Sequence, residues 1–387
     1  MNKDFSYQKI EELVDIGLGF THTPSYTTSG IPFLSVKNIT NGEISFNSTK
    51  FISKEDFEKA PNGAKPQKGD VLFGRVGTIG YPHVIETDIS FCTFVSLGYM
   101  RIKDSNILCN YYLKYWMKSD LFYSQVLSNI QGIAIKNLNT GWLKNFIIPT
   151  PPLPIQEQIV KELDTLSDII TKKKEQLAEL DKLAQAIFYD MFGDPIKNEK
   201  EWEMRRLEEL GDWASGGTPL RSNLLYFKGS IPWVTSGELN SLFINDTIEH
   251  INEEAIRNSN AKLIRKGSLL LGMYDTAALK SSINKREMAC NQAIAFSFIN
   301  TKLCNTIYVY YSIQINKEEY KKEQRGIRQK NLNLSMIKAI SILYPPLLLQ
   351  NQFAEKIEAI EQQKALINQS ITDTQLLFDY TMDKYFN

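Results

Sequence analysis

The sequence has few of the residues on which catalytic and metal sites usually depend. Its 387 residues include only 3 histidines and 4 cysteines. His22, His83 and His250 are isolated, without the spacing of a metal site or a catalytic triad. There is no HExxH, no GxSxG, no Walker-type loop and no Asn-Pro-Pro-Tyr-like methyltransferase motif. We therefore expect neither catalytic residues nor a metal ion in this chain.

Other signals are missing as well. The widely spaced cysteines form no CxxC pair, so we predict free, buried thiols in a reducing compartment. Lys and Arg number 44 and Asp and Glu number 44, so any argument for nucleic acid must rest on local charge. No apolar run has membrane-spanning length, and the N-terminus leads into no signal-peptide core. These absences predict a cytoplasmic protein. The cysteines are Cys92, Cys109, Cys290 and Cys304.

Two long segments with the same pattern are present instead. Residues 151–195 begin with a proline cluster and end in Gly-Asp-Pro, which are start and stop signals of a helix. Residues 345–387 begin with Pro-Pro and repeat the pattern. Apolar residues at alternating spacings of four and three predict a coiled-coil seam on each helix. The seam positions are Ile159, Leu163, Leu166, Ile170, Leu177, Leu180, Ala184, Ile187 and Met191, then Phe353, Ile357, Ile360, Ile367, Ile371, Thr374, Phe378, Thr381 and Tyr385.

Each helix is the natural partner of the other. Lys173 and Lys364 interrupt the two seams at single positions. Since the first helix leaves one globular part and leads to the next, the second has to run back to bury the same stripe. We therefore predict an antiparallel pair.

The repeat extends into the globular parts. FSYQKIEEL at 5–13 matches WEMRRLEEL at 202–210, and GIAIKNL at 132–138 matches GIRQKNL at 326–332. From that last match to the end of the chain the offset stays at 194 residues (326 − 132). The order is therefore globular domain, long helix, globular domain, long helix.

Short apolar runs bounded by turn signals predict a mixed α+β fold in each globular part. We predict two similar globular domains at 1–150 and 196–344. They are separated by long helices at 151–195 and 345–387, which gives an internal pseudo-two-fold repeat.

The first candidate site is the glycine-punctuated segment 74–80, GRVGTIG. It lacks the spacing of a phosphate loop, so a tight turn between strands is the simpler interpretation. The alternative is an exposed loop that presents Arg75 to a phosphate or a guanine edge. Its counterpart at 272–277 has no arginine and offers Tyr274, with Lys280 nearby.

The second candidate site is the loop before each long helix. No acidic residue occurs between Asp120 and Glu157 or between Glu323 and Glu355. Both stretches contain basic residues and asparagines, such as Lys136 and Asn137 in the first and Lys330 and Asn331 in the second. Basic side chains suit contacts to phosphates, and amides can reach base edges. A solvated loop would explain one such stretch, but its recurrence in both halves favours a function.

These motifs resemble the specificity subunits of Type I restriction–modification systems. The resemblance rests on PPLPIQEQ at 151–158 and its copy PPLLLQNQ at 345–352, and on the exit MFGDP at 191–195. GIPFLSV at 30–36, LFGRVGTIG at 72–80 and GIAIKNLN at 132–139 add to it. The second copy departs from the pattern, with Leu348 for Pro154 and Asn351 for Glu157.

The resemblance implies a non-catalytic DNA-recognition subunit. Each globular domain would read one half of a bipartite target in double-stranded DNA, and the helix pair would set the spacing. Two modification (methyltransferase) subunits would dock on it, and restriction subunits would join that core. S-adenosylmethionine, ATP and Mg would then belong to the partner subunits and not to this chain. The alternative is a structural adaptor that tethers two protein-binding domains. The predicted DNA-contacting residues are Lys37, Asn38, Arg75, Thr78, Lys136, Asn137, Asn139, Tyr274, Lys280, Arg328, Lys330, Asn331 and Asn333.

Overall fold

The computed structural model describes residues 5–40, 42–77, 79–129, 137–322 and 331–387. The chain divides into two compact units. The first unit comprises residues 1–174 and 369–387, and the second comprises residues 175–368. Each unit therefore contains one globular part and a portion of both long helices. The domain boundaries at 150, 195 and 344 remain a prediction.

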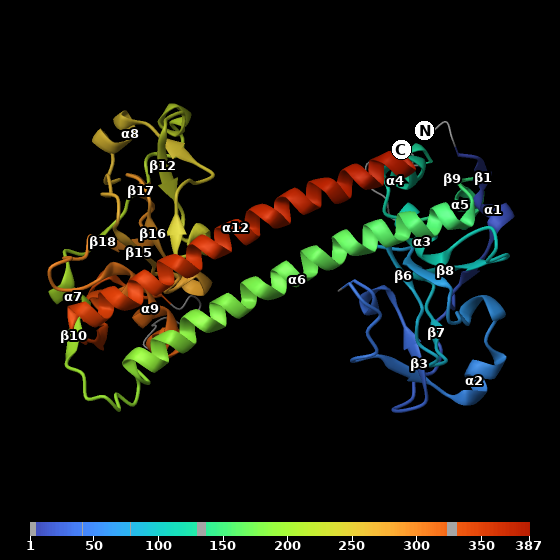
Figure 1. Cartoon of the computed structure of the whole chain (residues 1–387), viewed down its shortest axis with the longest axis horizontal. Coiled ribbons are helices and arrows are strands. Elements are labelled where there is room, and N and C mark those ends of the chain that lie inside the picture. Colours follow the sequence, from blue (N-terminus) through green and yellow to red (C-terminus); the bar gives the residue numbers. More distant parts are fainter. Residues whose placement is uncertain (1–4, 41, 78, 130–136, 323–330) are drawn as a thin grey trace. The chain divides into compact units, whose positions relative to one another are not determined.

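The two long helices are present as α6, Leu153–Phe192, and α12, Leu347–Phe386, each of 40 residues (Figure 1). Both begin directly after a pair of prolines, which fix φ and are tolerated only in the first turn of a helix. After α6, Gly193 adopts a φ of 80°, and its N–H donates to the Tyr189 carbonyl at 2.8 Å. Glycine accepts this left-handed conformation without strain, so it closes the helix.

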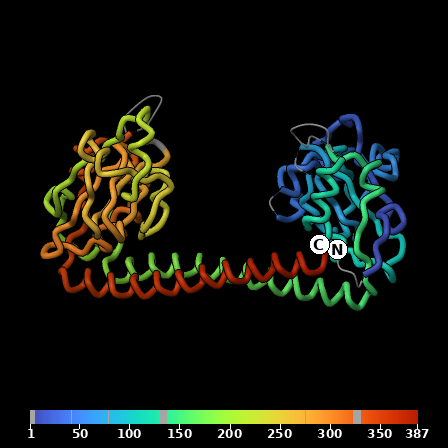
Figure 2. The backbone as a smooth tube through the Cα atoms, turned by 90° about the horizontal axis from the view of Figure 1, so that it is seen from above, coloured from blue at the N-terminus to red at the C-terminus, as the bar shows by residue number. Residues whose placement is uncertain are grey.

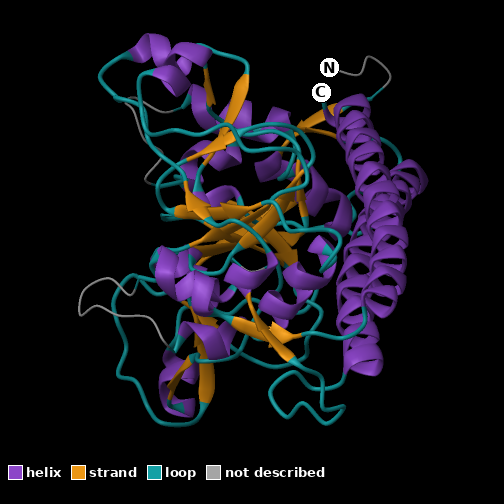
Figure 3. Ribbon diagram, turned by 90° about the vertical axis from the view of Figure 1, so that its left-hand side faces the viewer, coloured by secondary structure: helices purple, strands orange, loops and turns teal. Residues whose placement is uncertain are grey.

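Small β-sheets and short helices make up the globular parts of the chain (Figure 3). In the first unit, an antiparallel sheet has the order β2-β8-β5-β6, a smaller one has the order β4-β3-β7, and β1 pairs with β9. The strands are β1 Tyr7–Lys9, β2 Val14–Leu18, β3 Ile31–Leu34, β4 Lys50–Ile52, β5 Val71–Gly74, β6 Gly80–Val84, β7 Cys92–Thr93, β8 Leu97–Ile102 and β9 Ile147–Pro149. The helices are α1 Ile10–Leu13, α2 Lys54–Lys59, α3 Asn110–Trp116, α4 Asp120–Ser128 and α5 Thr140–Lys144, with 3-10 turns η1 Val36–Asn38 and η2 Asn62–Ala64.

The second unit repeats this strand order and adds one strand, β13, at the edge of its larger sheet. Its sheets have the orders β11-β18-β15-β16-β13, β14-β12-β17 and β10-β19. The strands are β10 Met204–Arg206, β11 Ala214–Ser215, β12 Ile231–Val234, β13 Phe243–Ile244, β14 His250–Ile251, β15 Leu269–Gly272, β16 Ser281–Asn284, β17 Ala289–Cys290, β18 Ile294–Ser297 and β19 Ser341–Leu343. The helices are α7 Leu207–Leu210, α8 Glu253–Arg257, α9 Thr306–Ile315, α10 Lys317–Lys321 and α11 Leu334–Ala339, with η3 Leu224–Phe227, η4 Ser236–Glu238 and η5 Asp275–Ala277. The internal repeat is therefore a repeat of strand order as well as of sequence.

In the first unit, the beginning of α6 and the end of α12 complete one hydrophobic core. Ile159 and Leu163 of α6 are buried in the same cluster as Met382 and Phe386 of α12. The Phe386 ring lies 5.0 Å from the ring of Tyr112 on α3, measured between centroids. Figure 2 shows the C-terminal end of α12 reaching the first globular part. Because opposite ends of the two helices meet here, they run antiparallel, as predicted.

The second unit uses the same positions of the repeat. Phe188 and Phe192 of α6 pack in one core with Phe353 and Ile357 of α12. The Phe192 ring lies 4.7 Å from the ring of Tyr308 on α9. An offset of 194 residues relates Phe192 to the C-terminal Phe386, so the two cores are built from equivalent pieces.

The charged residue in the seam of α12 has partners. Lys364 donates to Asp181 of α6 at 2.8 Å and to Glu361 of its own helix at 2.6 Å. Burial lowers the pKa of Lys364, but the hydrogen bonds and charges of the two carboxylates outweigh burial and raise it above the usual value. From the sequence, Lys364 was interpreted only as an interruption of the seam. Its ion pair with Asp181 was not predicted, because Asp181 lies far away in the chain.

Among the described residues, none of the helices combines the length and the apolarity that crossing a bilayer demands.

Candidate nucleic-acid interface

The two loops that the sequence singled out meet in each unit. In the first unit, Val76 of the glycine-punctuated loop forms a β-bridge with Asn137 of the basic loop. In the second unit, Tyr274 forms the corresponding bridge with Asn331. The contact continues by one residue in both, since the Leu138 N–H donates to the Arg75 carbonyl at 2.9 Å. The Leu332 N–H donates to the carbonyl of Met273 at 2.8 Å. Each unit thus gathers its two candidate loops into one surface.

Arg75 is half-buried, although one interpretation of its loop had it exposed. Its Nε donates to the Leu138 carbonyl at 2.9 Å, and its Nη1 donates to the Val95 carbonyl at 3.2 Å. Burial lowers the pKa of its guanidinium. The side chain therefore joins the basic loop to the segment before β8. A contact of Arg75 with DNA remains a prediction.

Three predicted asparagines hold local turns. The Oδ1 atom of Asn139 accepts from the N–H of Gly141 at the start of α5, and Asn333 accepts from the N–H of Met336 at the start of α11. These are the capping contacts that short helices need at their first turn. Asn38 accepts from the Ser35 N–H at 2.9 Å and donates to a loop carbonyl. These amide groups shape the surface, and direct readout by them remains a prediction.

The remaining predicted residues are distributed as follows. Lys280 is half-buried and donates to the side chain of Asn240 at 2.8 Å, and the Tyr274 side chain is 39% exposed. Lys37 is exposed beside Asn38. Thr78, Lys136, Arg328 and Lys330 lie outside the described residues.

A pocket of about 580 Å³ in the first unit extends the candidate surface. Lys37 and Asn38 line it, together with Tyr26, Phe33 and Lys50. Phe94 also lines the pocket and is next to Val95, whose carbonyl the Arg75 side chain bonds. Sequence reasoning missed Tyr26 and Lys50, because the pairing of β3 with β4 brings Lys50 opposite Phe33 and a bridge between Thr27 and Phe51 holds the segment of Tyr26.

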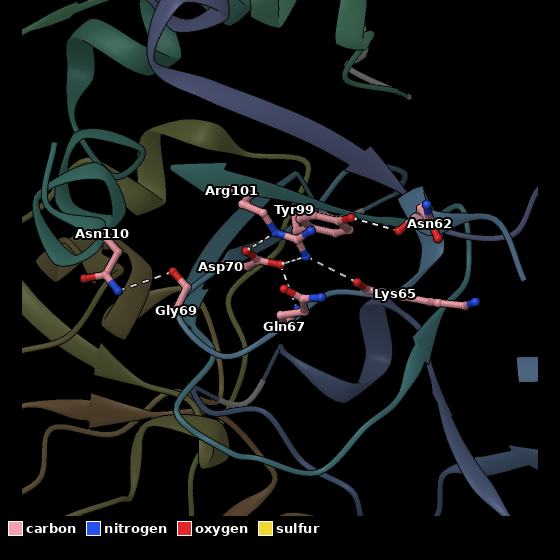
Figure 4. A network of polar contacts seen from close by, with 8 residues as sticks. All are labelled: Asn62, Lys65, Gln67, Gly69, Asp70, Tyr99, Arg101 and Asn110. Carbon is pink, nitrogen blue, oxygen red and sulfur yellow. Dashed lines mark hydrogen bonds and ion pairs between the residues drawn. The ribbon is translucent and has the colours of Figure 1, made fainter. Parts of the chain in front are cut away.

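An ion pair between buried Asp70 and half-buried Arg101 supports the turn that leads into β5 (Figure 4). Asp70 is 3% exposed and accepts from Nε and Nη2 of Arg101 at 2.9 and 2.7 Å. It also accepts from the N–H of Gln67, and Arg101 Nη2 reaches the Lys65 carbonyl at 3.4 Å. The Asp70 hydrogen bond raises the pKa of Arg101, against the opposing effect of burial. In the second unit, Asn284 accepts from the N–H of buried Ser268 at the corresponding turn.

The glutamine of each proline-rich helix entry is a structural anchor. Gln156 is 0% exposed, accepts from the Cys109 N–H at 2.9 Å, and donates to the carbonyls of Ile107 and Pro151 at 2.7 and 2.8 Å. Gln350 accepts from the Asn305 N–H at 2.9 Å and donates to Pro345 at 2.8 Å. These contacts fix the start of each long helix to its globular part.

The cysteines among these elements are free thiols. Cys92, Cys290 and Cys304 are buried as predicted, whereas Cys109 is half-buried. Burial raises the pKa of the Cys92 thiol to about 11, so it stays protonated at neutral pH. In the described part of the chain, no group of three or more His, Cys, Asp or Glu side chains is placed to hold a metal ion.

The family model described as "Type I restriction modification DNA specificity domain" matches residues 2–182 and 199–374. The Type I restriction enzyme MjaIX specificity subunit of Methanocaldococcus jannaschii is 23% identical over 381 residues, which cover 92% of this chain and 87% of that protein. The EcoR124I/EcoR124II specificity subunit of Escherichia coli is 30% identical over 143 residues, 34% of each chain.

Two solved structures share the fold. The S subunit of a Type I restriction–modification system from M. genitalium matches with a TM-score of 0.61 and 15% identity, covering 100% of this chain and 98% of that one. A chain from a study of complex assembly and conformational transition in the type I R-M system matches with a TM-score of 0.63 and 16% identity, covering 98% and 97%.

Proposed function

Because this chain belongs to the family of Type I restriction–modification DNA specificity proteins, we propose that it is a DNA-recognition subunit. Each globular domain reads one half of a bipartite target. The family match occurs twice, once in each half of the chain, as two recognition domains require. The adaptor alternative does not explain this match.

One observation carries the proposal. In both units a loop after the central strand, β5 or β15, is bridged to a loop that is rich in basic residues and asparagine and free of acids. Backbone phosphates bind such surfaces through lysine and arginine, and amides reach base edges. Equivalent loops with different side chains, Arg75 and Val76 against Met273 and Tyr274, suit two domains that read different half-sites.

The subunit itself carries out no chemistry in this proposal. Two modification subunits, which hold S-adenosylmethionine, dock on it and transfer the methyl group. Restriction subunits, which use ATP and Mg, join that core. An apolar groove of about 610 Å³ between α6 and α12 in the first unit supports docking on the helices. It is lined by Leu166, Leu377 and Tyr380, and the last two side chains are 52% and 66% exposed.

Methylation mapping tests the proposal in the host. Deleting this gene should remove methylation at one bipartite motif with an unread spacer, and restoring the gene should bring it back. Exchanging the first globular domain for that of another family member should alter one half of the motif only. Methylated motifs that stay the same after deletion would refute the proposal.

Binding experiments test the partners. The chain should shift a duplex that carries the mapped motif when modification subunits are present, and a duplex with either half scrambled should bind more weakly. Equal binding to both duplexes would exclude sequence recognition.

A further inference from the structure

The pocket that contains Lys37 has an aromatic floor with a cation above it. Strands β3 and β4 pair so that Phe33 lies opposite Lys50. The Tyr26 ring lies 5.8 Å from that of Phe33, between centroids, and Lys50 Nζ lies 4.0 Å above the Tyr26 ring. A ring in this position holds an ammonium group in place without neutralising its charge.

The pocket has no counter-charge of its own. Lys37 and Lys50 are exposed, and neither forms an ion pair with any residue that the structure describes. The other polar residues of the lining, apart from Tyr26, are the neutral Thr23, Ser35, Asn38, Asn47, Ser48 and Thr49. Two ammonium groups that line one concave, acid-free pocket form a site for an anion.

The second unit carries a different pair at the same positions of the repeat. Thr23-Pro24 matches Thr218-Pro219, which relates Tyr26 to Arg221. Trp233 takes the place of Phe33. Phe33 pairs with Lys50 across β3 and β4, and the Trp233 N–H donates to the carbonyl of Glu249, so Glu249 corresponds to Lys50. The Arg221 guanidinium lies 4.7 Å from the Trp233 ring centroid.

This second pair is closed on itself. Arg221 Nη2 donates to Glu249 Oε2 at 2.9 Å, and Nη1 bonds the other carboxylate oxygen. A bidentate pair of this kind leaves little net charge for a ligand. The two halves of the chain therefore differ here by an unneutralised cation.

We propose that the pocket of the first unit is a phosphate-binding subsite, in which Lys37 and Lys50 contact backbone phosphates of the target DNA. The inference rests on the proposed function and adds an asymmetry to it: the corresponding position of the second unit makes no such contact. The subsite adjoins the surface of the bridged loops, because the Val36 N–H bonds Ser96 Oγ and the Arg75 N–H bonds the Ser96 carbonyl.

The salt dependence of DNA binding tests this inference. The full chain, assembled with its modification subunits, is titrated with the mapped duplex over a range of salt concentrations. The logarithm of the binding constant falls linearly with the logarithm of the salt concentration. Each of Lys37→Gln and Lys50→Gln should make this negative slope shallower by about 0.9, and the double variant should make it shallower by about 1.8. The methylated motif should not change, since phosphate contacts carry no sequence information.

Lys54→Gln is the matched control. Lys54 is an exposed lysine at the start of α2 in the same unit and does not line the pocket. Its loss should leave the slope unchanged. Glu249→Gln, in the second unit, should release Arg221 from its carboxylate partner. The freed guanidinium should then add one phosphate contact and make the negative slope steeper by about 0.9.

Lysine acetylation, read by mass spectrometry, gives a second measurement. Duplex DNA should protect Lys37 and Lys50 in the complex but not Lys54. A double variant with the wild-type slope, or equal acetylation of the three lysines with and without DNA, would overturn the subsite while the proposed function stands. A wild-type complex that does not distinguish the mapped duplex from a scrambled one would overturn the proposed function, and the subsite with it.

Discussion

Replacing Gln156 by alanine isolates the anchor between α6 and the first globular part. The side chain makes three hydrogen bonds, to the Cys109 N–H and to the carbonyls of Ile107 and Pro151, and no part of the residue is exposed. At roughly 1 kcal/mol of net stability for each hydrogen bond, the loss is about 3 kcal/mol. The truncation also leaves the buried Pro151 carbonyl and the part-buried Cys109 N–H without this partner, which adds to the cost.

Gln158 provides the control on the same turn of the helix. Its side chain is exposed and bonds the half-buried Glu162 at 3.1 Å, so Gln158→Ala should change the free energy of unfolding by less than about 0.5 kcal/mol. The second unit offers an independent copy of the pair, with buried Gln350 and exposed Gln352.

Hydrogen exchange followed by mass spectrometry is the suitable assay, because it reports local opening in each unit separately. Exchange of the Cys109 amide should be faster by roughly two orders of magnitude in Gln156→Ala, since 1.4 kcal/mol corresponds to a factor of ten. Gln350→Ala should accelerate the Asn305 amide and leave Cys109 unchanged. Equal exchange of Cys109 in Gln156→Ala and Gln158→Ala would refute the anchoring role.

Three further predictions concern the long helices. Changing Leu177 and Leu180 together to aspartate should lower the melting temperature, because it places two charges in a half-buried seam; an unchanged melting curve would contradict the pairing of the helices. Lys364→Met should remove the stability that comes from the raised pKa of Lys364, which is present below about pH 10.5 and is lost as the pH rises through the folded-state value. Urea titrations of wild type and variant should therefore differ at pH 8, and the difference should shrink as the pH rises above 10.5 and through the raised pKa of Lys364. A difference that does not depend on pH would count against this. Inserting one heptad in both helices lengthens each by about 10 Å and should add about three base pairs to the unread spacer. Methylation at the original spacing would exclude the helices as the ruler.

The sequence was sufficient for the helices and for the repeat. Heptad spacing predicted the burial of Ile159, Leu163 and Ile170, and proline and glycine signals located the helix ends. The apolar runs at 71–73 and 269–271 are strands β5 and β15. Such signals are local, so they can be read without knowledge of long-range contacts.

The sequence did not reveal which side chains bond to partners far along the chain. The guanidinium of Arg75 bonds the carbonyls of Val95 and Leu138, one of which lies 63 residues further along, and its contact with DNA remains a prediction. Gln156 stood in a motif used for the resemblance, with no sign that it anchors the helix. The pocket around Lys37 depends on the pairing of β3 with β4, which the pattern of a single sequence does not specify.

The core of the first unit determines when the first domain can finish folding during synthesis. Tyr112 and Leu163 share one core with Met382, Tyr385 and Phe386, which the ribosome adds long after Leu163. At about 5–20 residues per second, the ~200 residues that follow the middle of α6 take on the order of 10–40 s to make. For that time the nascent first domain exposes an unfinished apolar face. The first globular domain can therefore complete its core only after residues 382–386 have left the ribosome.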